Sequence, residues 1–441
     1  MRLHIGIDDT DSTKGGCTTY IAALLIEKLS QFGAKFTDYP NIVRLNPNIP
    51  YKTRGNAAVA LRINIRNPVY DLVQETVLRT VEENSQLGEK GTDPAVVLLQ
   101  REPGLKIKRL SRKALSDIVP LKEAMSALNG SHATIVTYGS GLGLVGALGA
   151  IGQTLDRDHT FELIAYRKMR NWGTRRRIDP DSVRRMDRLT TPGTFNNYDP
   201  ANRRILITPH GPDPVLLGIR GESAFDVLKA FHLLRLHEPV ERWVIFRTNH
   251  ATDAHLESTS VNAVRLNRPI TLTGVVLDRP QRIAGGHVFF TLGYRNRAIR
   301  CAAFEPTGRF KEITARLVPG DKVTAFGGVK SHSENMAPTI NLEKLVIRQL
   351  ADDATIENPT CPKCGKHMKS AGRNQGFRCV RCRAIAPNAT KQIIKKNRPL
   401  RSGTYLPDKK AHRHLTRPLS RYGFENRRWN RDAPSGTWHS P

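Results

Sequence analysis

The 441-residue sequence has no apolar run of about 20 residues, the length that a transmembrane helix needs. It also lacks a signal-like opening, because Met1 is followed almost at once by strand-forming residues. Cysteine is scarce: there are six, and four of them form two Cys-x-x-Cys pairs. That usage is typical of a metal site and not of a secreted disulfide framework. We therefore expect a soluble, cytoplasmic protein with no membrane partner.

Acidic residues are also in short supply. The chain carries 40 Asp and Glu against 69 Lys and Arg, a formal net charge of +29. Such an excess says little about the fold, but it favours a polyanionic partner, and nucleic acid is the usual one. The alternative is a ribosome-like or merely soluble basic protein.

The expected strands and helices divide the chain into five parts, which together predict a multidomain α+β protein. Strands and helices alternate over residues 1–157, which predicts an α/β domain. Residues 158–266 give two strands, a helix and a strand, as in a ferredoxin-like domain. Five short strands with one helix after the third, at 267–350, predict an OB-fold barrel, with another small barrel as the alternative. The cysteine pairs lie in 356–388, and 389–441 forms a basic tail.

Hydrophobic periodicity predicts the individual elements. In the first part we expect a buried strand at 3–7 and helices at 18–32, 68–86 and 118–128. In the second part TFELIAYR, RRILITP and VERWVIFRT predict strands, and ESAFDVLKAFHLLRL predicts a helix. The run GLGLVGALGAIG predicts a close-packed helix of small residues. A dinucleotide site is disfavoured there, because the next strand ends in Arg167 instead of an acidic residue.

The four paired cysteines form the most specific motif. Cys361 and Cys364 are followed, after fourteen residues, by Cys379 and Cys382. Two such pairs can place four thiolates about 2.3 Å from one Zn²⁺, and a segment this small needs the metal to stay folded. The alternative is two redox dithiols or a disulfide pair. Since four cysteines leave no open coordination position, we expect a structural zinc in a nucleic-acid-binding ribbon.

The densest acidic cluster stands near the amino end, in IGIDDTDSTKGGCTT. Asp8, Asp9 and Asp11 follow the first predicted strand, at the edge of a sheet where α/β proteins bind ligands. Carboxylates at this spacing can bind Mg²⁺ together with phosphate oxygens. The alternative is an Asx turn with solvated charges.

The residues that follow the aspartates fit a phosphate site. Lys14, Gly15 and Gly16 approach the start of a predicted helix, where backbone amides favour phosphate. Thr18 and Thr19 stand where N-cap residues stand, so capping is their alternative role. Although no Walker A pattern is present, metal ligands beside a phosphate site suggest chemistry on a nucleoside triphosphate.

The last part of the chain, 389–441, mixes thirteen Lys and Arg with tyrosine, phenylalanine and tryptophan. Its apolar content is low. We expect it either to bind nucleic acid or to be a disordered, solubilising extension.

Four motifs carry a resemblance to a known family: GIDDTDSTKGGCTTY, RLNPNIPYKTRGNAAV, TPHGPDPVLLGIRGE and FRTNHATDAH. With the OB region and the zinc ribbon, the chain up to about residue 390 resembles the archaeal isoleucine-tRNA 2-agmatinylcytidine synthetases. The resemblance implies a kinase-like first domain and a ligase. This ligase would attach agmatine to carbon 2 of the wobble cytidine in the isoleucine tRNA with a CAU anticodon, through a phosphorylated cytidine. ATP would give AMP and pyrophosphate, and the modified tRNA would read AUA.

The resemblance also implies roles for single residues. The three aspartates would hold Mg²⁺, and Thr18 matches a threonine that becomes phosphorylated in the family. The residues expected to bind ATP are Lys14, Gly15, Gly16, Lys52 and Arg54. Agmatine is a dication, so carboxylates and a proton acceptor should surround it and the cytidine. The residues expected there are His210, Asp213, Glu222, Asp253 and His255.

Two other functions stay open at the level of the sequence. One is a non-catalytic OB and zinc-ribbon protein that binds RNA or single strands, and the other is a metal-dependent nuclease built on the aspartates. Release of AMP from ATP that needs both tRNA and agmatine distinguishes them, because a binder releases none and a nuclease shortens RNA without ATP.

Overall fold

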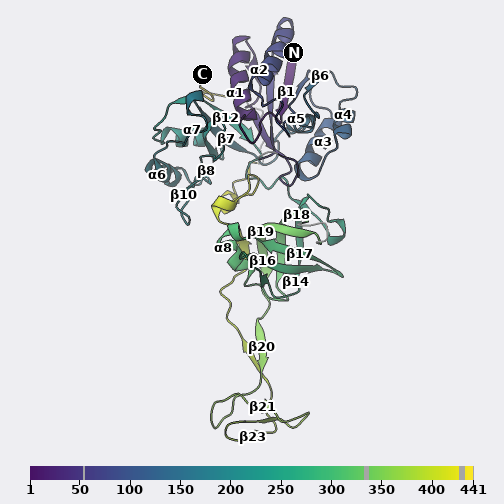
Figure 1. Cartoon of the computed structure of the whole chain (residues 1–441), viewed down its shortest axis with the longest axis vertical. Coiled ribbons are helices and arrows are strands. Elements are labelled where there is room, and N and C mark those ends of the chain that lie inside the picture. Colours follow the sequence, from purple (N-terminus) through teal and green to yellow (C-terminus); the bar gives the residue numbers. More distant parts are fainter. Residues whose placement is uncertain (53–54, 332–336, 427–432, 441) are drawn as a thin grey trace.

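The computed structural model of the chain describes residues 1–52, 55–331, 337–426 and 433–440. Three bodies follow one another along its long axis: a large body of helices around a sheet, a β-barrel, and a small module at the far tip (Figure 1). Within these residues, no helix combines the length and the apolar character that crossing a membrane requires.

A ten-stranded sheet forms the large body and runs through the first two predicted domains. In spatial order its strands are β6 (Ala133–Thr137), β5 (Ala95–Leu99), β1 (Arg2–Asp8), β4 (Ala57–Asn64), β3 (Asn41–Arg44), β12 (Val240–Thr248), β7 (Thr160–Arg167), β11 (Val215–Gly221) and β8 (Thr194–Phe195), with β2 (Lys35–Phe36) paired to β4. The parallel pairing of β3 with β12 joins the two halves, since Asn41 lies opposite Arg247. The predicted strand at 3–7 is confirmed as β1.

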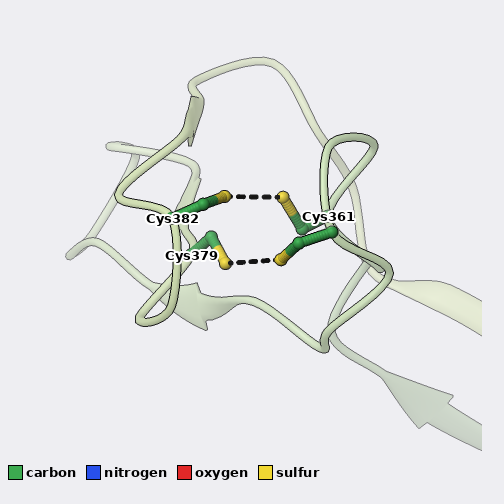
Figure 2. Close-up of side chains that lie close together, drawn as sticks. Cys361, Cys379 and Cys382 are labelled. Atoms are coloured by element: carbon green, nitrogen blue, oxygen red, sulfur yellow. Dashed lines mark hydrogen bonds between the residues drawn. The ribbon is translucent and has the colours of Figure 1, made fainter.

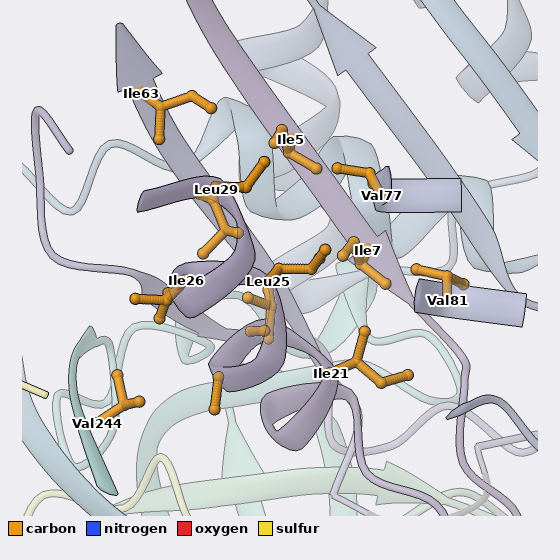
Figure 3. Packing of buried hydrophobic residues seen from close by; sticks show 14 of the residues in the cluster. Ile5, Ile7, Ile21, Leu25, Ile26, Leu29, Ile63, Val77, Val81 and Val244 are labelled. Carbon is orange, nitrogen blue, oxygen red and sulfur yellow. The ribbon is translucent and has the colours of Figure 1, made fainter. Parts of the chain in front are cut away.

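Two helices cover one face of the first half of this sheet. α1 (Thr18–Gln31) and α2 (Tyr70–Asn84) pack against β1, and Figure 3 shows Leu25 and Val81 close to Ile7. Apolar residues recur every three or four positions along both helices, so each helix turns one apolar stripe to the sheet. Burying each such side chain contributes about 1.5–3 kcal/mol. The predicted helices at 18–32 and 68–86 are therefore confirmed, apart from their ends.

The opposite face carries α3 (Leu105–Ser116), α4 (Leu121–Ala127) and α5 (Gly143–Gly152). The helix of small residues, α5, packs closely as predicted, because a Cβ at Gly152 would lie 2.7 Å from the carbonyl oxygen of Ile107 on α3. α4 matches the helix expected at 118–128, whereas α3 was not predicted.

The second half of the sheet has a ferredoxin-like order. Along the chain β7, α6 (Pro180–Thr190), β8, β11, α7 (Ala224–His232) and β12 form a β-α-β-β-α-β unit, and in the sheet its strands lie as β12-β7-β11-β8. The strand expected over RRILITP is wrong in position. Only β10 (Arg204–Ile205) forms there, paired to β9 (Tyr198–Asp199), and β11 takes the place in the sheet.

The middle body is a closed five-stranded barrel with one helix, as the sequence predicts. Its strands are β14 (Pro269–Val276), β16 (Val288–Tyr294), β17 (Arg297–Ala303), β18 (Lys322–Lys330) and β19 (Thr339–Gln349), with α8 (Arg309–Thr314) between β17 and β18. Two short strands, β13 (Glu257–Ser258) and β15 (Gln281–Arg282), extend the sheet. Pairing of β14 with β16 closes the ring, in the order β14-β16-β17-β19-β18.

A two-stranded stalk connects the barrel to the tip. The stalk is β20 (Ala354–Glu357) with β24 (Gln392–Lys395), and the tip holds β21 (Lys369–Ser370), β22 (Phe377–Arg378) and β23 (Ile385–Ala386). The structure thus presents the cysteine module on a narrow support, far from the large body (Figure 1).

The C-terminal segment, residues 401–426 and 433–440, does not form a free extension. Its strand β25 (Gly403–Tyr405) adds to β19 of the barrel, and the chain then returns to the large body. There the ring of Trp438 packs 5.2 Å from that of Phe36. The disordered alternative is therefore wrong for these residues, because they are folded into the barrel and the large body.

Candidate active site

A cavity of about 560 Å³ lies where the two halves of the large sheet meet the C-terminal segment. The first half lines it with the loop after β1, the end of β3 and the start of α5. The second half contributes residues of β7 and β11 and the loop after β12, and five residues between Lys409 and His414 complete the wall. This concave site gathers charged groups of both signs, which makes it the candidate active site.

The three aspartates reach the cavity through a tight turn. Asp8 ends β1, and Asp9 turns the chain with a φ of +59°. The Oδ2 of Asp9 accepts a hydrogen bond from the backbone N–H of Asp93 at 3.0 Å. Gly146 of α5 leaves room for Asp8, since a Cβ there would collide with the carboxylate. Asp11 lines the cavity beside them.

This acidic cluster is electrostatically unfavourable on its own. Burial raises the pKa of Asp8 well above its ordinary value, and the charges of Asp9 and Asp11 raise it further. Burial also raises the pKa of Asp9 to about 6, against the hydrogen bond from Asp93. A divalent cation would relieve both effects, because it compensates the negative charge. Carboxylate oxygens are the hard donors that Mg²⁺ prefers, but among the described residues only the four cysteines of the tip bring three or more ligand atoms within 4.8 Å of one another.

The Thr18 hydroxyl lies on the same cavity wall. Thr18 is the first residue of α1, and Cys17 before it occupies the N-cap position without a side-chain capping bond. The hydroxyls of Thr18 and Thr10 lie 2.9 Å apart, while Thr19 contacts the Cys17 sulfur at 3.0 Å. Helix capping therefore does not explain the position of Thr18.

Lys14, Gly15 and Gly16, which were expected to bind ATP, do not line the cavity in the described structure. The exposed Lys14 pairs with Glu89 at 2.8 Å. Gly16 has a φ of +81°, a conformation that suits glycine in the turn into α1. The loop folds back after Asp11, where the backbone N–H of Ser12 donates to the carbonyl of Gly15 at 2.9 Å, so that Lys14 is exposed while Gly15 is buried away from the cavity.

Basic side chains line much of the remaining wall. Lys52, expected to bind ATP, is one of them, and burial together with the charge of Arg413 lowers its pKa. The other lysines and arginines of the lining are Arg44, Arg204, Arg220, Lys409, Lys410 and Arg413. Such a wall can accept phosphate groups. The other predicted cation, Arg54, lies outside the described residues.

Two buried groups that were not predicted stand at this basic wall. Glu162 of β7 accepts a hydrogen bond from Nε of Arg220 at 3.0 Å, and its Oε2 lies 3.7 Å from Nδ1 of His250. Burial opposes ionisation of Glu162, but Arg220, His250 and Arg44 hold its pKa well below the ordinary value. Burial and Arg220 lower the pKa of His250 to about 4, so this imidazole is neutral at pH 7.

Two of the five residues expected around agmatine line the cavity: His210 and Asp213. The carboxylate of Asp213 pairs with Arg176 at 3.0 Å. The Nε2 of His210 lies 2.5 Å from a guanidinium nitrogen of Arg204. Both side chains come from the loop before β11, so this loop forms one side of the site.

The other three, Glu222, Asp253 and His255, lie away from the cavity in the described structure. Glu222 pairs with Arg421 at 2.6 Å, Asp253 pairs with a barrel lysine, and the fully buried His255 contacts Glu343 of the barrel at 3.0 Å. In the described structure these side chains tie the large body to the C-terminal segment and to the barrel, and their expected role around agmatine stays a prediction.

The C-terminal segment supplies a part of the wall that sequence reasoning missed. The carbonyl of His414 accepts a hydrogen bond from the backbone of Ala251 at 2.8 Å, and its exposed ring packs edge-to-face with His250 at 5.1 Å. Arg421 is buried and pairs with Asp158 at 2.9 Å, which anchors the segment. The sequence signal was weak, because basic and aromatic residues mix there without a helical or strand period.

The four cysteines of the tip lie together as expected (Figure 2). The sulfurs of Cys361 and Cys382 are 3.4 Å apart, as are those of Cys364 and Cys379. A disulfide would need about 2.05 Å, whereas four thiolates about 2.3 Å from one zinc ion stand nearly this far apart. The module therefore fits a structural zinc site.

Comparisons with protein families account for most of the chain. Residues 4–140 match the TiaS TCKD domain and residues 141–255 the TiaS FLD domain. Residues 270–348 match an OB-fold nucleic acid binding domain, and residues 358–400 match the TiaS C-terminal zinc ribbon domain.

Whole-chain relatives agree with these matches. The chain is 41% identical to the isoleucine-tRNA 2-agmatinylcytidine synthetase TiaS of Archaeoglobus fulgidus, over 97% of this chain and 99% of that protein. A crystal structure of TiaS with its tRNA and ATP superposes with a TM-score of 0.88 at 40% identity, covering 96% of this chain and 97% of that one. A crystal structure of TiaS with tRNA, AMPCPP and agmatine gives 0.85 at 38% identity, with the same coverage.

Proposed function

The chain belongs to the family of isoleucine-tRNA 2-agmatinylcytidine synthetases, and we propose the reaction and the site residues from that premise. It is a ligase that uses ATP to join agmatine to the anticodon cytidine of an isoleucine tRNA. We infer that agmatine enters at carbon 2, that the product tRNA reads AUA, and that ATP gives AMP. Because one phosphate passes through the cytidine and leaves alone, the other products are two phosphates, with one water consumed, instead of the pyrophosphate that the resemblance implies. The observation that supports this best is one cavity in which half-buried carboxylates, a threonine and a basic wall meet. A non-catalytic binder is not favoured, since it has no use for a cluster of acids in the wall of a cavity.

The aspartate cluster is proposed as the metal site. Asp8, Asp9 and Asp11 would hold Mg²⁺, which when bound supplies positive charge to the phosphates of ATP. Lys52 and Arg44 of the basic wall bind and orient the same phosphates. The carboxylates need no proton transfer in this role, because they act as ligands in their ionised form.

Phosphoryl transfer explains why a ligase of this kind needs such a site. The oxygen on carbon 2 of cytosine is a poor leaving group, and phosphorylation turns it into a good one. Positioning and charge neutralisation dominate such a transfer. The Thr18 hydroxyl, which borders the cavity together with the aspartates, is proposed as a phosphate acceptor during the cycle.

The barrel and the ribbon are proposed to hold the tRNA while its cytidine enters the cavity. They extend from the large body along the long axis (Figure 1), so they can bind parts of the tRNA that lie far from the reacting base. Most of these contacts would reach phosphates and position the tRNA. Taking the base out of its stack costs roughly a few kcal/mol, which the distant contacts offset. Its substrates, a tRNA and ATP, support a cytoplasmic location.

AMP formation tests this function. The protein is incubated with the isoleucine tRNA, ATP and agmatine, each omitted in turn, and AMP and tRNA length are measured. We expect sustained AMP release only when both tRNA and agmatine are present, with the tRNA intact. A protein that releases no AMP, or that shortens the tRNA without ATP, contradicts the proposal.

A further inference from the structure

Three side chains of the cavity wall take no part in the ATP chemistry above: Glu162, His250 and His414. Glu162 and His250 are only 2% and 3% exposed. Within the part of the chain that the structure describes, neither Oε2 of Glu162 nor Nδ1 of His250 has a hydrogen-bond partner. The two atoms instead face each other, and Oε2 also lies 3.8 Å from a guanidinium nitrogen of Arg44, so this buried group of charged side chains forms one part of the cavity wall.

The geometry of these groups is that of an oriented imidazole. The Oε2 of Glu162 lies 3.7 Å from Nδ1 of His250, close enough to attract a proton on that nitrogen. A carboxylate behind one ring nitrogen favours the tautomer in which the other nitrogen, Nε2, is an acceptor. The ring of His414, 5.1 Å away, packs against His250 and restricts its rotation.

We propose that His250, oriented by Glu162, accepts a proton from the primary amine of agmatine as this amine attacks the activated cytidine. The proposal rests on the function proposed above. The bond from nitrogen to carbon 2 forms, and the bond from carbon 2 to the phosphate oxygen breaks, with its electron pair leaving on phosphate. The ammonium group of agmatine loses two protons in all. The departing phosphate takes one, and His250 takes the other and passes it to water.

The charges around His250 tune its strength as a base. The titratable and charged groups that face it are Glu162, Arg44, Arg220 and His414. Burial and the two arginines keep the imidazole neutral, and Glu162 acts against them. A phosphate group on the activated cytidine would offset the two arginines, so His250 becomes more basic when the substrate of the second step is bound.

The test separates the two steps in single-turnover reactions. Phosphate transfer to the tRNA is measured without agmatine, and joining is measured after agmatine is added. In His250→Gln we expect phosphate transfer within about threefold of the wild type and joining slower by about 100-fold, a usual contribution of a general base. His132→Gln, at an exposed histidine of the surface, is the matched control and should change neither step.

Glu162→Gln tests the positioning role. Loss of the carboxylate lowers the pKa of His250, so the acid limb of the pH profile for joining should move to lower pH while that for phosphate transfer stays.

His414→Gln, at an exposed residue, replaces His250→Gln as the test variant if the latter does not fold. The rate of joining alone should then fall by about tenfold. Equal losses in both steps, or unimpaired joining, would overturn the proposal. A wild type that makes no agmatine adduct would instead refute the function.

Discussion

At the scale of single residues, the acidic turn after β1 gives up stability for chemistry. Asp8 and Asp9 are held in a half-buried position where loss of solvent and the neighbouring carboxylates raise the pKa of both side chains. A protein selected only for folding would replace one of them by an amide. Their presence makes sense if a cation and phosphate occupy the site during the reaction.

The variant Asp9→Asn separates the effect of this carboxylate on folding stability from its effect on the reaction. The folded pKa of Asp9, about 6, exceeds the ordinary value of 3.8, so this carboxylate lowers stability progressively as pH rises from about 4 to 6. Without divalent cations at pH 7, we expect the variant to gain about 1–3 kcal/mol in free energy of unfolding and to lose AMP formation. Denaturant unfolding with a chelator present measures the first, and an AMP assay the second. A variant less stable than the wild type would contradict this account of the cluster.

Gly146 tests the space around Asp8. A Cβ at this position would collide with the Asp8 carboxylate, so Gly146→Ala should cost about 1–3 kcal/mol and abolish AMP formation. Gly149→Ala, on the same helix, is the matched control, because its Cβ would meet the flexible end of Leu45 at 3.1 Å and the Cβ of Ala114 at an ordinary 3.9 Å. Thermal unfolding and AMP release measure both variants. Equal unfolding temperatures and equal AMP release in the two variants would mean that the Asp8 carboxylate can move without loss of stability or activity.

Some of the site was predictable from the sequence because its residues are neighbours in the chain. Asp8, Asp9 and Asp11 share one turn, so their spacing alone predicts a cluster. The sequence pattern could not show which histidine lies at the cavity, because His250 and His255 stand five positions apart in the same loop. His250 lies at the cavity and His255 lies against the barrel, and this outcome depends on tertiary packing.

At the scale of elements, the errors in the predicted fold have the same cause: the sequence pattern does not show tertiary packing. The barrel strands were predictable because each has its own alternation and glycine turns. Helix α3 was missed although Ile107, Leu110 and Ala114 recur at helical spacing, a signal that its many lysines and arginines obscured. RRILITP and PVLLGIRG are both apolar runs, and only long-range pairing with β7 decides that the second enters the sheet.

The C-terminal segment is the element with the largest effect on the site. Arg421, with a side chain 0% exposed, joins Asp158 and Glu222 and so holds the segment that carries His414. Aromatic packing of Trp438 secures the far end. We therefore expect loosening of this segment to open one wall of the cavity.

Arg421→Met should cost about 3 kcal/mol, because it leaves Glu222 without its cation and leaves Asp158 with Arg417 alone. The cost should be smaller at pH 5 than at pH 8, since burial raises the pKa of Glu222 and Arg421 no longer opposes the rise. Arg401→Met, at an exposed site, is the control and should stay within about 0.5 kcal/mol. Denaturant unfolding at both pH values measures this. A cost that does not depend on pH would contradict the ion-pair account.

At the scale of the whole molecule, the proposed tRNA-binding parts of the chain lie apart from the cavity where the reaction is proposed to take place. The cavity lies in the large body, and the ribbon stands at the end of a stalk beyond the barrel (Figure 1). A net charge of +29 over this length can meet many phosphates of one tRNA.

Excising the ribbon tests this separation. The backbone N–H of Lys396 donates to the carbonyl of Asp353 at 2.7 Å, so a short Gly-Ser linker can replace residues 354–395. We expect weaker tRNA binding with a shallower dependence on salt, because phosphate contacts are lost, and unchanged binding of ATP. Filter binding at several salt concentrations and calorimetry measure these. Loss of ATP binding, or an unchanged salt slope, would contradict the division of roles.

The most direct test of the central claim is mass spectrometry of the isoleucine tRNA after incubation with the protein, ATP and agmatine. The account predicts that the nuclease fragment containing the wobble cytidine gains the mass of agmatine less that of water, with the wild type and not with Asp9→Asn. An unmodified fragment with the wild type, or an adduct formed without ATP, would contradict it.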